Sequence, residues 1–349
     1  MATTVIALLA LVVPIWGLPP LAPTQYPGVY QLTEPVDHAE CPSWDYRNNI
    51  LYYVNIHEGQ VYRYDYDQGN LAYITLDGEV APVIPSSRDP NLLIVGLDRS
   101  VAAVEWDGVS DPSETRILAA LAPDFPTSRV NDGKADKQGR LWIGTMGYEG
   151  PDGLTPDEGI LYQVTCNNLD SPLIEIAPIN ISNGLAWNAA NDKFFYIDTP
   201  SGQVVQYSYN DETGEISDRK VVFDVNNHTE HIVGGPDGMT IDEDDNLWVA
   251  LYGGGAIIKV DSSNGDLLEI VPLPALDVTS AIWGGPDLDI LYVTTSRVSL
   301  TDEQKLEQPA AGAVFAIVGL GTKGRPTFEV DILGSIDDES CGAKIALRS

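Results

Sequence analysis

The chain has 349 residues, 44% of them hydrophobic, so it is long enough to bury a large core. Its 51 acidic and 19 basic residues give a formal net charge of −32 at pH 7. This charge repels phosphate backbones and anionic lipid surfaces, so we expect no nucleic-acid partner. The 32 glycines, 24 prolines and 16 tyrosines favour turns and β-structure over helices.

The first residues, MATTVIALLALVVPIWGLPP, contain an apolar run that is too short to span a bilayer and has the length of a signal-peptide core. We predict a secretory signal peptide over residues 1–17 and a secreted, extracellular protein with no stable membrane insertion after cleavage. The segment lacks Lys and Arg, so an uncleaved leader or anchor, or a cytoplasmic protein, is the alternative. Sequons at Asn180 and Asn227 are compatible with export.

The three cysteines, Cys41, Cys166 and Cys341, are too few for a disulfide scaffold. One bridge is compatible with an oxidising compartment, and the spacing does not determine which two cysteines would pair. No CxxC or Cys/His spacing indicates structural zinc.

Six similar units follow one another along the chain, each with an apolar and aromatic strand, a turn and a second strand. In order they are NNILYYVNIHEGQVYRYDYDQGN, NLLIVGLDRSVAAVEWDG, GRLWIGTMGYEG with GILYQV, DKFFYIDTPSGQVVQYSYN, DNLWVALYGGGAIIKVDSSNG, and DILYVTTSR with GAVFAIVGL. They return about every 40 to 55 residues, as the blades of a propeller do. We predict an all-β, six-bladed β-propeller over residues 18–334 and a C-terminal tail over residues 335–349. A two-domain β-sandwich is the competing fold, but it does not explain the sixfold return.

Polar residues stand just ahead of a predicted strand in several units. They are Glu40 in AECPSW, Arg129 and Asn131 in SRVNDGKAD, Asn183 in ISNGLAW, and Asp237 in GGPDGMTID. Loops that enter the inner strands of a propeller converge at its axis, so we expect these side chains to meet there. Their carboxylate and amide oxygens suit Ca²⁺, Mg²⁺ or Mn²⁺, and carboxylates also hold zinc in open catalytic sites.

Each of these residues has a simpler interpretation when it is taken alone. Asn183-Gly184 and Asp237-Gly238 are common turn signals, and Asp132 or Asp136 is suited to cap a turn. The segment DEDDNLW lacks the glycine and the closing glutamate of an EF-hand, so we interpret it as a turn between strands. No GxSxG elbow is present, which argues against a serine hydrolase of the α/β type.

The motifs above, together with FFYID and LPALDVTSAIWGG, resemble in order the signatures of the regucalcin family. This family is also called the senescence marker protein or gluconolactonase family, and it includes luciferin-regenerating enzymes. The resemblance runs from about Gly28 to Gly324. It implies a six-bladed propeller with one divalent cation at the axis and, in many members, hydrolysis of sugar lactones.

The resemblance also implies roles for individual residues. By motif match, Glu40, Asn183 and Asp237 are implied to be metal ligands. Asn131 is implied to lie by the metal and the substrate, and Arg129 to hold substrate hydroxyls or the carbonyl. Glu149 stands where the family often has a carboxylate that contacts substrate. The family's usual Gly and Ser around the first Glu are Ala39 and Cys41 here, and both are small enough to preserve the ligand geometry.

We therefore expect a metal-dependent lactonase, a gluconolactonase-like hydrolase of carboxylic esters, with a small-molecule lactone as its substrate. One cation, with Ca, Zn, Mn and Mg left open, would polarise the ring carbonyl while water attacks it, and Asp237 would accept the proton of that water. The alternative is a non-enzymatic propeller that binds calcium or a small ligand. The sequence leaves the oligomeric state open.

Overall fold

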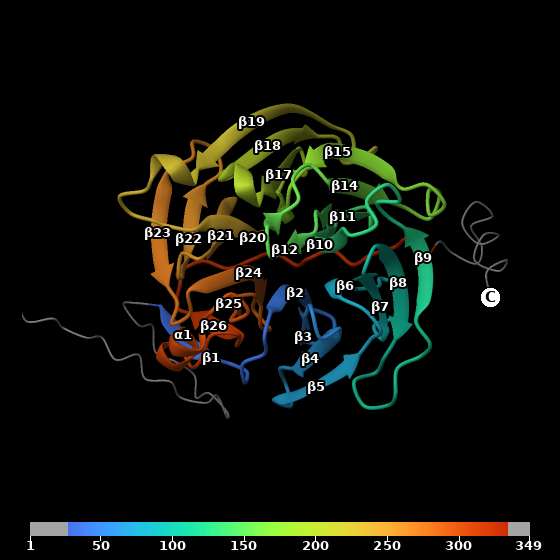
Figure 1. The fold of residues 1–349 in the computed structure, drawn as a ribbon, viewed down its shortest axis with the longest axis horizontal. Coiled ribbons are helices and arrows are strands. Elements are labelled where there is room, and N and C mark those ends of the chain that lie inside the picture. The colour runs from blue at the N-terminus through green and yellow to red at the C-terminus, as the bar shows by residue number, and fades with distance from the viewer. Residues whose placement is uncertain (1–26, 334–349) are drawn as a thin grey trace, which may run out of the picture.

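The computed structural model describes residues 27–333, so the predicted signal peptide and the whole of the predicted tail lie outside the described residues. The described chain forms six four-stranded antiparallel sheets around a central axis (Figure 1). This is the predicted six-bladed β-propeller, and the all-β fold class is confirmed. In the described range no helix is long and apolar enough to cross a membrane.

The four strands of each blade follow one another in order from the innermost, next to the axis, to the outermost. Blades 1 to 3 comprise β2 (Ala39–Asp45), β3 (Ile50–Asn55), β4 (Gln60–Asp65) and β5 (Asn70–Thr75); β6 (Val80–Pro85), β7 (Leu92–Leu97), β8 (Ser100–Glu105) and β9 (Arg116–Ala120); and β10 (Arg129–Ala135), β11 (Leu141–Met146), β14 (Gly159–Val164) and β15 (Leu173–Ile179). Blades 4 to 6 comprise β16 (Ser182–Trp187), β17 (Lys193–Asp198), β18 (Gln203–Tyr209) and β19 (Ile216–Asp224); β20 (Gly235–Ile241), β21 (Asn246–Tyr252), β22 (Ala256–Asp261) and β23 (Leu267–Pro272); and β24 (Asp277–Gly284), β25 (Ile290–Ser296), β26 (Phe315–Val318) and β1 (Gly28–Gln31). Outside the blades lie the hairpin β12 (Glu149–Gly150) and β13 (Gly153–Leu154), the helix α1 (Asp302–Glu307), and the 3-10 turns η1 (Thr199–Ser201) and η2 (Val225–Asn227).

The ring is closed by a strand from the opposite end of the chain. β1 pairs antiparallel with β26, with Gly28 opposite Val318 and Gln31 opposite Phe315. Blade 6 therefore combines the first described strand with the last three. The innermost strands β24 and β2 then contact each other, which completes a ring of six neighbouring inner strands. No inner strand is left with an unpartnered flank.

The hydrophobic core lies between adjacent blades. Trp142 and Leu161 of blade 3, for example, pack in one buried cluster with Leu185, Phe194 and Tyr196 of blade 4. These residues belong to strands rich in aromatic and branched side chains, which pack well on pleated surfaces. The six repeated units of the sequence correspond to the second and third strands of each blade. Each unit was predicted to contain two strands, and it does.

The polar segments that were expected to be loops ahead of strands are themselves the innermost strands. SRVNDGKAD contains β10, and Glu40, Asn183 and Asp237 lie within β2, β16 and β20. The expectation of a loop was wrong because these strands line a polar channel at the axis, where alternation of apolar and polar residues does not apply. Asn183-Gly184 and Asp237-Gly238 likewise lie inside strands and form no hairpin turn.

Every innermost strand is irregular in its pairing with the second strand of its blade. The register shifts lie between Glu40 and Ser43, Val80 and Val83, Val130 and Asp132, Asn183 and Leu185, Pro236 and Met239, and Val278 and Ser280. Such bulges bend a strand and change the direction of the side chains beside them. The predicted site residues Glu40, Asn131, Asn183 and Asp237 all lie at or next to a bulge.

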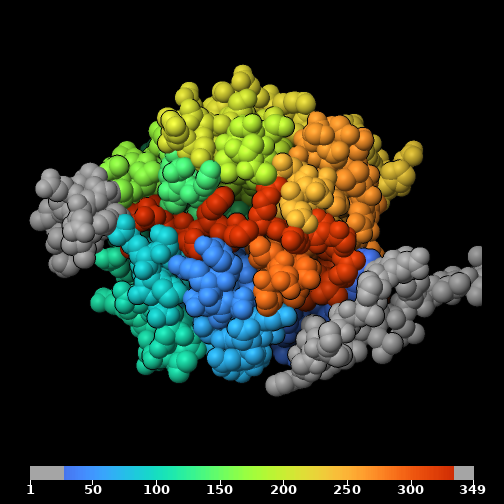
Figure 2. Space-filling model, turned by 180° about the vertical axis from the view of Figure 1, so that it is seen from behind, coloured from blue at the N-terminus to red at the C-terminus, as the bar shows by residue number. Residues whose placement is uncertain are grey.

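A segment that follows β26 crosses the far face of the propeller, and we call residues 319–333 the strap. Figure 2 shows it from behind, running across the middle of the molecule. Gly324 bridges Asp242 of blade 5, the Thr327 hydroxyl donates to the Trp44 carbonyl, and Val330 bridges Ser86. The strap therefore ties blades 5, 1 and 2 together at the end of the channel where the innermost strands finish.

Asp136 is a buried acceptor at the turn between β10 and β11. Its carboxylate accepts hydrogen bonds from Arg140 Nε at 2.6 Å, Trp142 Nε1 at 2.9 Å and the Tyr209 hydroxyl at 2.8 Å. It also accepts hydrogen bonds from the backbone N–H groups of Gln138 and Arg140, so the predicted turn cap is present.

Asp242 has the same role in blade 5. Its carboxylate accepts a hydrogen bond from Trp248 Nε1 at 3.1 Å. The segment DEDDNLW is the turn between strands that the sequence predicted.

We predict that Asp136→Ala lowers the free energy of unfolding by about 3–5 kcal/mol, because it leaves a buried guanidinium, an indole N–H and a hydroxyl without their acceptor. Urea denaturation followed by tryptophan fluorescence measures the change. Asp331→Ala is the control, since Asp331 pairs with Arg88 at the surface, and it should cost at most about 1 kcal/mol. Equal losses in the two variants would contradict the structural role assigned to Asp136.

Candidate functional site

The predicted site residues gather at one mouth of the central channel, where the innermost strands begin. Glu40 comes from β2, Asn131 from β10, Asn183 from β16 and Asp237 from β20, and all four are at most 8% exposed. The structure therefore brings together residues that lie up to 197 positions apart in the sequence. The bulges described above aim them at the axis, which a regular strand would not do for adjacent positions.

Two amides and a guanidinium form a hydrogen-bonded chain on one side of this mouth. Arg129 Nη1 donates to Asn131 Oδ1 at 2.8 Å, and Asn131 Nδ2 donates to Asn183 Oδ1 at 3.2 Å. Asn183 Nδ2 in turn donates to the Thr199 hydroxyl at 2.8 Å. Because an amide oxygen has two lone pairs, Asn183 Oδ1 can accept from Asn131 and still coordinate a cation. Asn131 thus orients both of its neighbours.

Three buried carboxyl groups in this mouth, those of Glu40, Asp132 and Asp237, lie near enough for their charges to affect one another. Burial, and then the charge of Asp132, raises the pKa of Glu40 to about 8. Burial also raises the pKa of Asp237 well above its ordinary value, with further contributions from Glu40 and Asp132. The pKa of Asp132 is raised to about 6 by burial, an effect that nearby Lys134 opposes. The mouth is therefore a place where negative charge is costly unless a cation is present.

The Asp237 carboxylate is the group in this mouth that is best suited to bind a cation. It is 5% exposed and accepts no hydrogen bond from any residue in the described range. A buried carboxylate normally has a hydrogen-bond or ionic partner, so its oxygens are free to bind a metal ion. Glu40 is similar, since within the described chain its carboxylate accepts hydrogen bonds from the adjacent Cys41 alone. Hard oxygen ligands of this kind fit a divalent cation.

The ligand set contains only two carboxylates. Across residues 27–333, no three His, Cys, Asp or Glu side chains are placed together as a metal-binding group. A cation at this mouth would therefore depend on Glu40 and Asp237 together with the amide oxygen of Asn183, a neutral ligand. Oxygen-rich sites that mix carboxylates and amide carbonyls are typical of calcium and magnesium.

Lys134 lies in the channel beyond Asn131 and Asp132 along β10. Its ammonium group donates to the Leu185 carbonyl at 3.0 Å and the Met239 carbonyl at 2.5 Å, so it joins blades 3, 4 and 5. Burial lowers its pKa, and the charge of Asp132 counteracts this effect. Cys41 connects across the channel, because its thiol donates to the Asn131 carbonyl at 3.4 Å. Hydrogen bonds from Lys134 and Cys41 thus connect several blades just below the mouth.

The rim of the mouth adds charged groups around Arg129. The Arg129 Nε atom lies 4.0 Å from Glu79 Oε2, and Glu79 Oε1 lies 2.7 Å from His57 Nδ1. Glu149 is exposed on β12, which lies close to the axis in Figure 1. It is near enough to Arg129 for its charge to raise the pKa of that guanidinium, although burial lowers this pKa overall.

Asp132 and Lys134 are the site residues that the sequence reasoning did not assign. Asp132 was expected to cap a turn, but it lies inside β10 and faces the channel. A signal was available, since residues two apart in a strand share a face, and Asp132 and Lys134 have that spacing. It was overlooked because the segment was taken for a loop. Cys41 is a free buried thiol, and Cys166 is disulfide-bonded; Cys341 lies outside the described residues.

Fold and site together define a class, a six-bladed propeller whose innermost strands present buried carboxylates and amides at one mouth of the axial channel. Within that class, the chain belongs to the SMP-30/Gluconolactonase/LRE-like family, whose pattern it matches over residues 38–297. The resemblance found in the sequence motifs is confirmed.

Individual relatives support the same assignment. Regucalcin from Sus scrofa is 36% identical over 290 residues, which cover 83% of this chain and 93% of that protein. A luciferin-regenerating enzyme of known structure is 34% identical, with a TM-score of 0.82 and coverage of 88% of this chain and 100% of that one. A regucalcin from Agrobacterium tumefaciens, described as a calcium-binding protein, is 25% identical, with a TM-score of 0.75 and coverage of 86% and 96%.

We predict that Asp237→Asn stabilises the protein when divalent cations are removed with a chelator. A carboxyl whose pKa is raised in the folded state costs stability at any pH above its unfolded pKa, and the amide removes this cost. The melting temperature should rise by roughly 2–4 °C, because an increase of about 1 kcal/mol in the free energy of unfolding raises the melting temperature of a large domain by that amount. Calorimetry measures it. Asp67→Asn, at an exposed turn, should leave it unchanged, and a lower melting temperature for Asp237→Asn would refute the argument.

Proposed function

We propose that this protein is a divalent-metal-dependent hydrolase that opens the rings of sugar-type lactones. The observation that carries the proposal is the buried Asp237 carboxylate, which has no hydrogen-bond partner in the described chain and stands beside Glu40 and Asn183 at the channel mouth. Membership of a family whose description includes gluconolactonase supports the choice of substrate. A lactone is a cyclic carboxylic ester, so the site must stabilise charge that develops on a carbonyl oxygen.

Glu40, Asn183 and Asp237 would hold the cation, for which Ca, Zn, Mn and Mg are the candidates. When bound, it supplies Lewis-acid stabilisation of the negative charge that forms on the lactone carbonyl oxygen. It also balances the mutual repulsion of the buried carboxylates.

Arg129 and Asn131 would orient the lactone. Arg129 Nη1 is held by Asn131 Oδ1 and the Val130 carbonyl, whereas its Nη2 atom donates to no group in the described chain. Those N–H groups are available to substrate hydroxyls or to the carbonyl. Fixing the guanidinium in advance lowers the entropic cost of placing substrate against the attacking water. Glu149 on the β12 hairpin is suited to accept hydrogen bonds from sugar hydroxyls at the rim.

Asp237 would act as the proton acceptor. The oxygen of the attacking water forms a bond to the carbonyl carbon, and its proton moves to the Asp237 carboxylate. The ring C–O bond then breaks, and the same proton passes to the departing ring oxygen, which leaves a hydroxy acid. No other described residue competes for the Asp237 oxygens by hydrogen bonding, so they remain accessible for this transfer.

A propeller that binds calcium or a small ligand without turnover is the second candidate. It is favoured by the Agrobacterium tumefaciens relative, which is described as a calcium-binding protein. The same residues would then hold the cation without a reaction. Metal binding with no hydrolysis of any lactone would select this function.

We also propose that the protein is secreted, with the signal peptide over residues 1–17. The disulfide-bonded state of Cys166 supports this location, because stable disulfides form in oxidising compartments. Of the two sequons, Asn227 is exposed, whereas the Asn180 amide donates to Asp198. Glycosylation would therefore be expected at Asn227.

We predict that metal-stripped protein is inactive and that one added divalent cation restores hydrolysis of a sugar lactone, measured as proton release in a panel of sugar and aliphatic lactones. Glu40→Ala and Asp237→Ala should each reduce kcat/KM by at least about 10²–10³-fold, the typical loss for a group that stabilises transition-state charge. Wild-type turnover that persists without metal, or near-normal turnover in either variant, would count against the mechanism.

Arg129→Ala should reduce kcat/KM for sugar lactones by roughly 10²-fold, because the substrate loses a fixed donor. Arg88→Ala is the matched control: Arg88 pairs with Asp331 on the strap, away from the mouth, and should leave kcat/KM unchanged. Steady-state kinetics with both variants test the assignment, and equal effects would remove Arg129 from the substrate site.

A further inference from the structure

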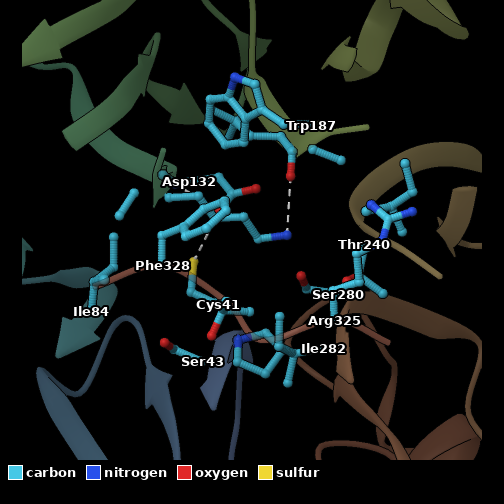
Figure 3. A pocket seen from close by; sticks show the side chains of 18 of the residues that line it. Cys41, Ser43, Ile84, Asp132, Trp187, Thr240, Ser280, Ile282, Arg325 and Phe328 are labelled. Atoms are coloured by element: carbon cyan, nitrogen blue, oxygen red, sulfur yellow. Dashed lines mark hydrogen bonds between the residues drawn. The ribbon is translucent and has the colours of Figure 1, made fainter. Parts of the chain in front are cut away.

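A cavity lies at the far end of the channel, behind the mouth that holds the predicted site. Its volume is about 150 Å³, and Figure 3 shows side chains from several blades around it. The walls come from the second halves of the innermost strands and from strap residues 325–328. The residues that line it include Cys41 and Asp132 but none of Glu40, Asn131, Asn183 and Asp237. The cavity therefore adjoins the mouth through Cys41, Asp132 and Lys134 but contains none of the predicted metal ligands.

The body of this cavity is apolar. Its apolar lining side chains include Val83, Ile84, Leu185, Ile282 and Phe328. The strap contributes Phe328, which also packs against the core cluster between blades 2 and 3. A cavity of about 150 Å³ with apolar walls is large enough to bind a molecule the size of benzene.

The charged side chains around the cavity are already engaged by the protein. Lys134 donates to two backbone carbonyls, as described above. Arg325 Nη2 donates to the Asp242 carbonyl at 2.8 Å and the Glu243 carbonyl at 3.1 Å, and it forms an ion pair with Asp245. Asp132 accepts from the Gly133 N–H at 2.7 Å and lies next to Lys134. Each of these charged side chains thus has a partner in the described chain, so an ionic ligand would have to compete with that partner, and its burial would be costly.

Three hydroxyl groups in the lining have no hydrogen-bond partner in the described chain. They belong to Ser43 of β2, Thr240 of β20 and Ser280 of β24, which Figure 3 labels around the cavity. Thr240 is 5% and Ser280 is 4% exposed, and Ser43 is half-buried. Because hydroxyl groups in such positions normally pair, a molecule inside the cavity would supply the partner that the described chain does not.

We propose that this cavity is a second small-molecule site, which binds an uncharged molecule with an apolar body of about one six-membered ring and one hydroxyl group. The apolar walls take the ring, and the hydroxyls of Ser43, Thr240 and Ser280 take the polar group. The proposal does not depend on lactone hydrolysis, because the cavity shares no residue with the proposed ligand set.

Phenol, benzene and benzoate form a probe series that differs only in the polar group. Ligand-observed NMR titration of the full chain should show saturable binding of phenol, with benzene weaker by about fivefold, the effect of one net hydrogen bond. Benzoate should bind still more weakly, because its charge has no free partner in the cavity. No saturable phenol binding, which would mean that water alone fills the cavity, or benzoate binding as tight as phenol, would overturn the proposal.

Variants locate the binding. Removing all three hydroxyls in Ser43→Ala/Thr240→Val/Ser280→Ala should reduce phenol affinity about fivefold and leave benzene affinity unchanged. Thr240→Val alone should change affinity in the same direction, which keeps the test available if the triple variant does not fold. Thr322→Val is the control, because the Thr322 hydroxyl is likewise without a hydrogen-bond partner in the described chain but does not line the cavity. An unchanged preference for phenol over benzene in the triple variant would refute the site.

Discussion

The antiparallel pairing of β1 with β26 places the first and last strands of the described chain in one blade, and the closed ring of innermost strands depends on it. Once the ring is closed, six strands surround the axis, and their polar side chains have no apolar layer in which to pack. The bulge in each innermost strand then turns side chains such as Glu40 and Asp237 toward the channel. Closure and bulges together create a polar axis inside a molecule whose cores lie between the blades.

This construction carries an electrostatic cost. Glu40, Asp132 and Asp237 are buried near one another, and the pKa of each is raised. The surrounding blades are stabilised elsewhere, by interblade aromatic packing and by acceptors such as Asp136. A rigid scaffold can therefore hold an arrangement that is unfavourable without a ligand, which is a common property of functional sites.

The two ends of the channel differ in chemistry because different structural elements line them. At the mouth where the innermost strands begin, the Asp237 carboxylate and Arg129 Nη2 have no hydrogen-bond partner in the described chain, which suits a cation and a polar substrate. At the far end the strap supplies Phe328 and engages Arg325, so the cavity there is apolar and neutral. Asp132, Lys134 and Cys41 separate the two regions and cross-link the blades, so one axis provides two environments.

The sequence by itself determined the number of blades, the second and third strand of each, and the family, because these follow from local patterns that repeat along the chain. It also identified Glu40, Asn131, Asn183 and Asp237 as residues that converge. It did not show that their segments are strands, since a strand lining a polar channel lacks the alternation that reveals a strand elsewhere. Only the tertiary structure placed Asp132 and Lys134 in the channel, left Asp237 without a hydrogen-bond partner among residues 27–333, and put strap residues in the wall of the far cavity. These features depend on contacts between residues up to hundreds of positions apart, such as the Thr327–Trp44 hydrogen bond, which form only when the ring is closed.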